Sequence, residues 1–206
     1  GKTTSLDVLK PIVFNGELLV NPTQAVLFRT VEDSSPTLLI DEAERFRGRD
    51  SQNAAMMEVL RSGYKDGACV KRMKPPHYRE FDRYRTYGPK IFAGINELDS
   101  VLRDRAILIR MRRKGAEDRV LSYIEDEPTI SRIGWIRDAC YLFGLHHAPS
   151  LRRIYEGGGE DVPGLAGMHS RERELYTPLM TLAHYIETLA GDKKRTLSQA
   201  MIEGAA

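Results

Sequence analysis

The chain has 206 residues, and its 31 Lys and Arg nearly balance its 29 Asp and Glu, which leaves a formal net charge of +2. With 41% hydrophobic and 29% charged residues, the composition is typical of a globular protein and excludes a wholly disordered chain. No apolar run reaches the roughly 18 residues that a membrane-spanning helix needs. GKTTSLDVLK lacks signal-peptide features, and Cys69 and Cys140 fit neither a disulfide framework nor a zinc pattern, so we expect a cytoplasmic protein.

Strands and helices alternate over about the first 112 residues. Apolar side chains at helical spacing predict helices over 3–14, 23–33 and 51–62, with a break near Pro11, an N-cap at Thr23 and an end at Gly63. Short apolar runs predict strands at 17–20, 37–44, 90–95 and 106–111, and a hairpin is expected from 68–73 and 78–84. This alternation predicts an α/β fold, a mostly parallel sheet with helices on its faces.

The pattern after Lys114 is helical throughout. Helices are expected over 116–125, 129–146, 150–156, 171–190 and 195–203, and the Gly-rich EGGGEDVPGLAG at 156–167 is expected to be a linker. One apolar stripe is expected along 171–190, formed by Leu175, Leu179, Leu182, Ile186 and Leu189. The sequence therefore predicts an α/β core over 1–114 and an all-helical subdomain over 115–206.

The first residues, Gly1-Lys2-Thr3, match the end of the phosphate-binding pattern G-x-x-x-x-G-K-[ST]. That chemistry needs backbone N–H groups around the phosphates, a lysine on the β- and γ-phosphates, and a hydroxyl on Mg²⁺. The following helix directs its positive N-terminus at the same phosphates. The tripeptide alone is a weak signal, and a solvated chain end is the alternative interpretation.

Two acids end the apolar run Leu38-Leu39-Ile40-Asp41-Glu42. At the carboxyl end of a parallel strand they face the ligand crevice of an open α/β sheet, where Asp41 could hold Mg²⁺ and Glu42 could polarise an attacking water. Asn96 ends the next apolar run and could position that water or contact the γ-phosphate. A solvated strand end and a simple turn asparagine are the alternatives.

Together these segments resemble the AAA+ class of P-loop ATPases, with Walker A in GKTT, Walker B in LLIDEAE and sensor one at Asn96. Within that class the chain is most similar to a poorly characterised family found beside phage and plasmid primase-helicases. The similarity, which extends to superfamily 3 and minichromosome-maintenance-type motors, is carried by PTLLIDEAERF, GPKIFAGI, LRDRAILIRMRRK and RERELYTPLMTLA. It covers about 1–114 well and 165–190 moderately. It implies a truncated Walker A, so residues of a Gly-rich loop are expected before Gly1.

The resemblance implies ATP and Mg²⁺ as cofactors. Nucleotide would be bound by Gly1, Lys2, Thr3 and Thr4, and the metal by Thr3 and Asp41. Glu42 and Asn96 would act in catalysis. Arg105, with Arg103 as the alternate, would reach a neighbouring subunit's γ-phosphate, and Arg171, rather than Arg173, would be sensor two at the start of a helical lid. A surface arginine paired with a nearby acid is the alternative for each.

The segment from Lys71 to Lys90 carries seven Lys and Arg against Glu80 and Asp82, with aromatic residues between them. Such a segment suits nucleic acid, because cations neutralise phosphates and aromatic rings stack on bases. We expect Lys71, Arg72 and Lys74 to bind it. The alternative is an ordinary hairpin with a solvated basic face and aromatics packed on the sheet.

These features predict an ATP-hydrolysing motor that works as a homo-oligomeric ring. Its expected partner is DNA, and its expected role is replication of a mobile element or phage. A helicase or translocase is the first expectation, and no membrane association is expected. Two alternatives stay open: an AAA+ machine that remodels protein, and a non-catalytic nucleic-acid-binding relic of an ATPase.

Overall fold

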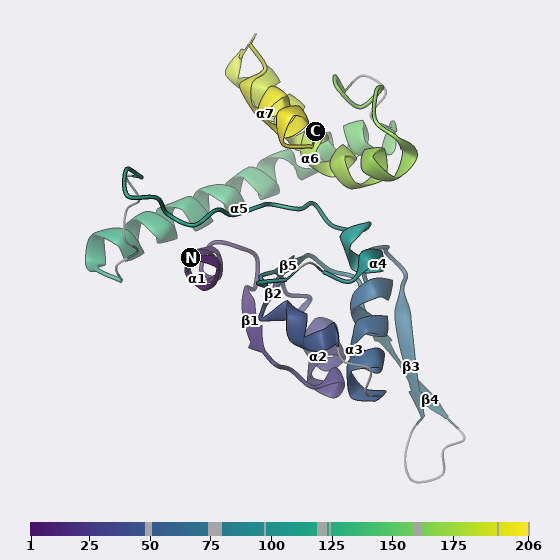
Figure 1. The fold of residues 1–206 in the computed structure, drawn as a ribbon. Coiled ribbons are helices and arrows are strands. Elements are labelled where there is room, and N and C mark those ends of the chain that lie inside the picture. The colour runs from purple at the N-terminus through teal and green to yellow at the C-terminus, as the bar shows by residue number, and fades with distance from the viewer. Residues whose placement is uncertain are drawn as a thin grey trace. The chain divides into compact units, whose positions relative to one another are not determined.

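The computed structural model (Figure 1) describes residues 1–47, 51–73, 80–96, 98–118, 123, 125–158, 162–192 and 194–205. The chain divides into two compact units. The first comprises Gly1–Arg103 and Ile109–Arg137, and the second comprises Asp104–Leu108 and Asp138–Ala206. The boundary expected after Lys114 remains a prediction.

A three-stranded parallel sheet forms the centre of the first unit. Its strands are β1 (Glu17–Val20), β2 (Leu38–Asp41) and β5 (Lys90–Phe92), in the order β1-β2-β5. Leu19 lies opposite Ile40, and Ile40 opposite Phe92. The expected α/β class is thus confirmed, as a small, mostly parallel sheet flanked by helices.

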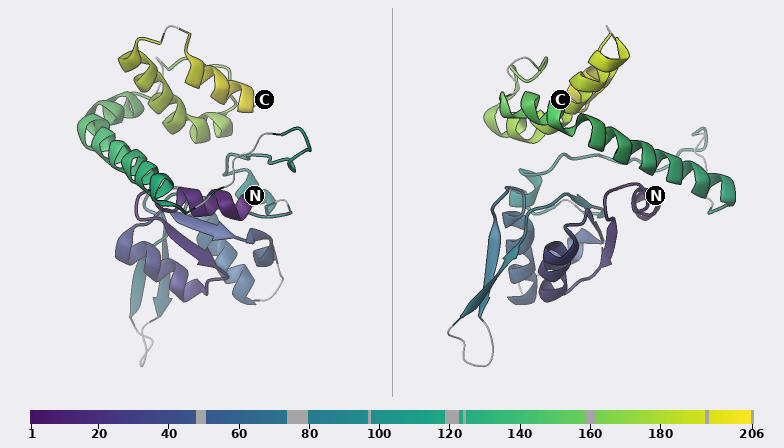
Figure 2. Two further views of the ribbon diagram at one scale, coloured as in Figure 1. Left: turned by 90° about the vertical axis from the view of Figure 1, so that its left-hand side faces the viewer. Right: turned by 180° about the vertical axis from the view of Figure 1, so that it is seen from behind.

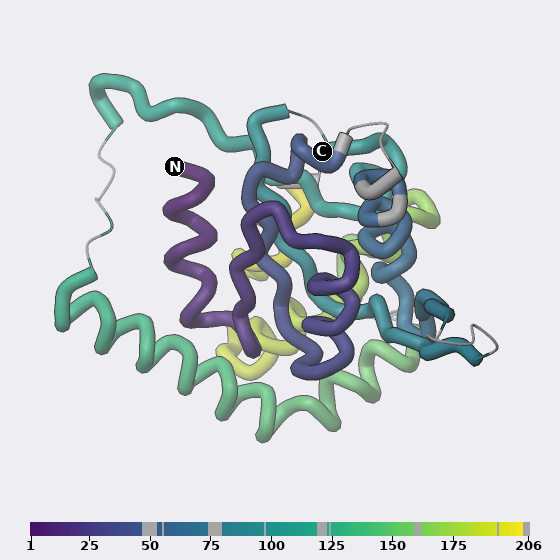
Figure 3. Tube along the Cα trace, turned by 90° about the horizontal axis from the view of Figure 1, so that it is seen from below, coloured from purple at the N-terminus to yellow at the C-terminus, as the bar shows by residue number. Residues whose placement is uncertain are grey.

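Helices cover both faces of this sheet. Residues alternate between the faces along β2, so Leu39 points to α1 (Lys2–Leu9), where it packs with Leu6 and Ala93. Leu38 and Ile40 point the other way, into a larger core built by α2 (Gln24–Ser34) and α3 (Ser51–Ser62). Figure 3 shows α1, in purple, running beside the strands. The Thr23 hydroxyl accepts a hydrogen bond from the Val26 amide, which confirms the expected N-cap of α2.

An antiparallel hairpin of β3 (Cys69–Met73) and β4 (Phe81–Arg85) extends away from the sheet, as both views of Figure 2 show. Its base is anchored on α2, where the rings of Tyr84 and Phe28 lie 4.3 Å apart between centroids. The expected hairpin is confirmed for these strands, and its connection at 74–79 lies outside the described residues.

Two expectations for the middle of the chain are wrong. Residues 106–111 are not a strand, and their side chains are largely solvent-exposed, with Ile109 81% exposed. An apolar run becomes a strand only where a neighbouring strand accepts its backbone hydrogen bonds, and this run pairs with none of the described strands. The described residues of 116–125 are not helical. The short α4 (Ser100–Arg103) precedes this region, and η1 (Ala43–Arg47) is a 3₁₀ turn after β2.

The helices expected at 129–146 and 150–156 are one continuous helix, α5 (Glu127–Glu156), which runs through Pro149 and contributes to both units. The second unit also contains α6 (Ser170–Ala190) and α7 (Thr196–Ala205). The segment expected as a linker supplies Val162 and Leu165 to the core of this unit, where they pack on Met180. Because this segment is rich in glycine, its composition did not indicate that Val162 and Leu165 would be buried.

The buried face of α6 also differs from the expected stripe. Leu179 and Leu189 are exposed. Met180 and Ala183, which belong to the row shifted by one residue along the helix, are buried. Both rows have helical spacing, and Met180 faces inward because Val162 and Leu165 cover it. Periodicity alone could not choose between two adjacent rows.

Lys90 is a largely buried cation that joins three segments of the first unit. Its Nζ donates hydrogen bonds to the carbonyl oxygens of Gly63, Thr86 and Gly88, at 3.0, 2.9 and 2.9 Å. Burial lowers the pKa of Lys90 to about 8, from the 10.5 of an exposed lysine. Between these pH values the unfolded chain therefore holds more protons than the folded one, so the free energy of unfolding rises with pH through this window.

We expect this rise to be absent in Lys90→Met. Urea unfolding of both proteins across the window from pH 8 to 10.5 measures the difference, because the other titrating groups are common to the two chains. The free energy of unfolding of the wild type, relative to that of the variant, should increase as pH rises through this window and then become constant. Parallel pH curves would show that Lys90 does not titrate in this range.

Candidate functional site

The first turn of α1 meets the end of β2 through one hydrogen bond. The Thr3 hydroxyl donates to Asp41 Oδ2 at 2.9 Å, between residues 38 positions apart in the chain. The contact follows from the packing of Leu6 on Leu39, which sets the start of α1 beside the carboxyl end of the strand. The structure thus brings together the two segments that the sequence singles out, GKT and DE.

Gly1 is the N-cap of α1, and the helix begins at Lys2. The first helical backbone bond runs from the Ser5 amide to the Gly1 carbonyl, so the amides of Lys2, Thr3 and Thr4 lie at the open end of the helix. The amino group of Gly1 donates to the Thr4 hydroxyl at 3.2 Å. All four predicted nucleotide-binding residues therefore lie in one turn, next to Asp41.

Glu42 occupies a strained turn directly after Asp41. Its φ of 52° is left-handed, which a residue with a side chain adopts at a cost of order 1 kcal/mol. Asp41 Oδ1 accepts the Glu42 amide at 2.9 Å and stabilises the turn. The Glu42 carboxylate is about half exposed and lies 2.9 Å from the guanidinium of Arg45. Arg45 is a residue that the sequence analysis missed, although its i,i+3 spacing from Glu42 was visible.

The loop that carries Asn96 is tied to this turn. The Ala43 amide donates to the Ala93 carbonyl at 3.0 Å, and the Ile95 amide donates to Glu44 Oε2 at 3.2 Å. A Cβ on Gly94 would lie 2.7 Å from the same oxygen, so a larger residue there would require the Glu44 carboxylate to move. Asn96 itself is exposed at this edge of the sheet. Glu44 is the second residue that the sequence analysis missed, and the only local signal was a third acid in DEAE.

A further anchor lies just before the segment with Arg105. Arg61 of α3 makes a two-pronged ion pair with Asp99, with N–O distances of 3.0 and 2.8 Å. Asp99 also accepts the amides of Val101 and Leu102 at the start of α4. The Arg61 hydrogen bond holds the pKa of Asp99 below its usual range.

The two predicted catalytic arginines belong to the second unit, so the site described above is built from the first unit alone. Arg105 lies in the turn after α4. Arg171 lies in the first turn of α6, where it pairs with Glu174 at 2.8 Å. Their roles toward a nucleotide remain predictions.

The hairpin places two of the three residues predicted to bind nucleic acid, Lys71 and Arg72, on opposite faces. Lys71 is exposed on the outer face, with its Nζ 4.8 Å from the centroid of the Phe81 ring. Arg72 is half-buried on the inner face, over the ring of Phe28 at 5.6 Å, and donates to the Lys71 carbonyl. Lys74 lies outside the described residues. Lys71 and Arg72 thus lie on opposite faces, because neighbours on a strand point to opposite sides, and their binding of nucleic acid remains a prediction.

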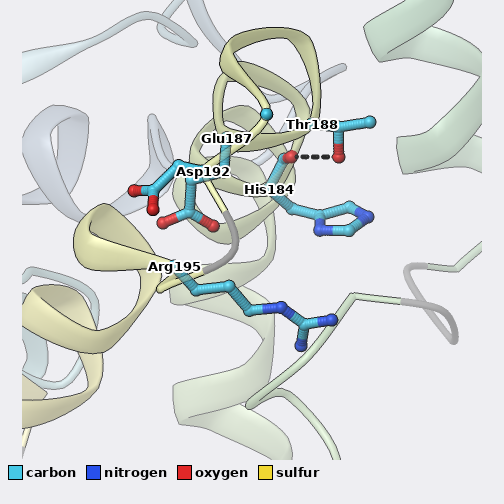
Figure 4. Close-up of a pocket in the computed structure, with 6 residues that line it drawn as sticks. His184, Glu187, Thr188, Asp192 and Arg195 are labelled. Carbon is cyan, nitrogen blue, oxygen red and sulfur yellow. Dashed lines mark hydrogen bonds between the residues drawn. The ribbon is translucent and has the colours of Figure 1, made fainter.

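The second unit has a pocket at the turn between α6 and α7 (Figure 4). It is lined by His184, Glu187, Thr188, Gly191, Asp192 and Arg195. Both carboxylates are used to hold the turn: Glu187 accepts the amide and hydroxyl of Ser198, and Asp192 accepts the amides of Lys194 and Thr196. The Thr196 hydrogen bond lowers the pKa of Asp192. The pocket contains none of the predicted site residues, and its carboxylates serve to hold the turn between α6 and α7.

Within the described ranges, no group of three His, Cys, Asp or Glu side chains could hold a metal by itself, and no helix is long and apolar enough to cross a membrane. No family model matches the chain, and no curated protein or solved structure is significantly similar to it.

Proposed function

We propose that the protein is an AAA+ P-loop ATPase that binds Mg-ATP at the first turn of α1 and hydrolyses it. The observation that carries this proposal is the 2.9 Å hydrogen bond between Thr3 and Asp41. A lysine followed by a hydroxyl residue at a helix start, beside a carboxylate at a strand end, is the oxygen and charge arrangement that Mg-nucleotide binding needs.

The side chains present fit the cofactor. Mg²⁺ takes hard oxygen ligands and usually keeps several waters, so one hydroxyl and one carboxylate suffice together with phosphate oxygens. Bound Mg²⁺ would neutralise charge that develops on the phosphates. Lys2 and the amides of the first turn would hold the phosphate oxygens, Glu42 would take a proton from the attacking water, and Asn96 would orient that water.

The basic hairpin supports the proposal that the motor acts on nucleic acid, in the first instance DNA. Lys71 and Arg83 are both exposed on one face of it. Arg105 supports a ring of identical subunits, because an arginine finger completes the site of a neighbour. A helicase or translocase of a phage or mobile element is the function that we propose on these grounds.

The test is Mg²⁺-dependent binding of a fluorescent ATP analogue to the protein. Interactions with charged groups contribute about 1.5–3 kcal/mol each, so Asp41→Asn and Thr3→Val should each weaken binding in Mg²⁺ by about tenfold or more. In EDTA both variants should resemble the wild type.

Asp33→Asn is the matched control, because it makes the same chemical change on an exposed part of α2. It should bind as the wild type does. Equal binding by Asp41→Asn and wild type in Mg²⁺ would contradict the proposed site. Binding without any phosphate release would instead support the non-catalytic alternative.

A further inference from the structure

The two faces of the β3–β4 hairpin have different surroundings. Side chains alternate along each strand, and those on the inner face, Val70, Arg72, Asp82 and Tyr84, are buried or half-buried. Every residue of the outer face is exposed, namely Cys69, Lys71, Met73, Phe81, Arg83 and Arg85. The outer face is therefore a continuous surface on one side of a projecting ribbon (Figure 2).

An exposed aromatic ring lies next to two cations on this face. Phe81 is 48% exposed, and the Lys71 Nζ and the Arg83 Cζ lie 4.8 and 5.8 Å from its ring centroid. Lys71 and Arg83 are cross-strand partners in the register, so the ladder holds them side by side. Asp82, the acid of β4, belongs to the inner face, and the charge of Arg85 is offset by Glu32 at 3.5 Å.

This arrangement matches the chemistry of an unpaired nucleotide. A base can stack on the ring of Phe81, and the phosphates on either side can be neutralised by Lys71 and Arg83. In a duplex the bases are already stacked on one another, so the ring offers an advantage only to a single strand. Neither contact reads base identity, so binding should be independent of sequence.

We propose that Phe81, Lys71 and Arg83 form a stacking platform for single-stranded nucleic acid on the outer face of the hairpin. The inference rests on the proposed action of the protein on nucleic acid and names the surface that would make the contact. It replaces Arg72 by Arg83 as the partner of Lys71.

The experiment is fluorescence anisotropy with a labelled oligothymidylate of about 15 nucleotides, near the upper site size of small single-strand binders. Alanine at a stacking position costs about 1–3 kcal/mol per base, which corresponds to an affinity loss of about 5- to 150-fold for Phe81→Ala. Phe81→Leu should lose much of the same affinity, since it keeps apolar area without a π-face, and Phe81→Trp should retain it. Tyr87→Ala, at an exposed aromatic residue beyond β4, should bind as the wild type does.

The charges are tested with a pair of neighbours. Lys71→Gln and Arg83→Gln should each reduce the slope of log affinity against log salt by about 0.7, the value for one lost phosphate contact on a single strand. Arg72→Gln removes the same charge one residue away but on the inner face, and it should leave the slope unchanged. An unlabelled duplex should compete poorly. Thermal unfolding of every variant checks that the fold is kept.

Wild-type affinity in Phe81→Leu, or an equal loss in Arg72→Gln and Lys71→Gln, would overturn the platform. ATP binding is measured on the same preparations, so that the two proposals are separated. If Mg²⁺-dependent ATP binding is absent but Phe81→Ala still weakens single-strand binding, the ATPase site is rejected and the platform is kept. An absence of single-strand binding in the wild type would reject the platform alone, and Phe81-dependent binding of an unfolded polypeptide would then favour protein remodelling.

Discussion

Arg105→Ala is expected to lower ATP hydrolysis by about 10³- to 10⁵-fold, the range for an arginine that stabilises transition-state charge from a neighbouring subunit. Nucleotide affinity should be largely unchanged, because the proposed contact is made only in the transition state. Phosphate release and binding of a fluorescent ATP analogue measure the two quantities. Arg103→Ala is the matched control, at the last residue of α4, and should remain active.

Mixing Arg105→Ala with Glu42→Gln protein gives a sharper test of action between subunits. A mixed ring contains some interfaces with an intact Glu42 on one side and an intact Arg105 on the other, so part of the activity should return. If oligomers form and no activity returns, Arg105 does not act in a neighbour's site. If Arg103→Ala is the inactive variant, the two arginines exchange roles.

Glu42→Gln should slow hydrolysis by about 10²- to 10⁴-fold, the contribution of a general base, while ATP binding persists. Glutamine keeps the size and hydrogen-bonding capacity of the side chain but cannot take the proton from water. Glu58→Gln makes the same change on the exposed side of α3 and serves as the control. Wild-type turnover in Glu42→Gln would exclude Glu42 from proton transfer.

Local patterns predicted those elements of the fold whose ends carry their own signals. Helix α2 begins after the Thr23 cap, and α3 ends just before Gly63, where a Cβ would meet the Thr86 carbonyl oxygen. Residues 106–111 have the same apolar character as the true strands but pair with no strand in the described part of the chain, and no local signal indicates whether a partner is present. The strand at 106–111 was therefore overpredicted for a nonlocal reason.

The candidate site was predictable where it depends on sheet geometry. The meeting of Thr3 with Asp41 follows from a helix packed on the carboxyl end of a parallel strand. The roles of Glu44 and Arg61 were not predictable, because no motif or strand end singles out their partners Ile95 and Asp99. The opposite orientations of Lys71 and Arg72 could have been inferred from strand alternation, which a count of charges ignores.

The close approach of Gly94 to Glu44 has a consequence for how this sequence can vary. The space at residue 94 is set by the carboxylate of residue 44, which also receives the Ile95 amide. A larger residue at 94 would displace that carboxylate and leave the amide without its acceptor, and a shorter one at 44 would make room but withdraw the same acceptor. The two positions are therefore coupled through one carboxylate, and across divergent sequences we expect a residue larger than glycine at 94 mainly where residue 44 is no longer glutamate.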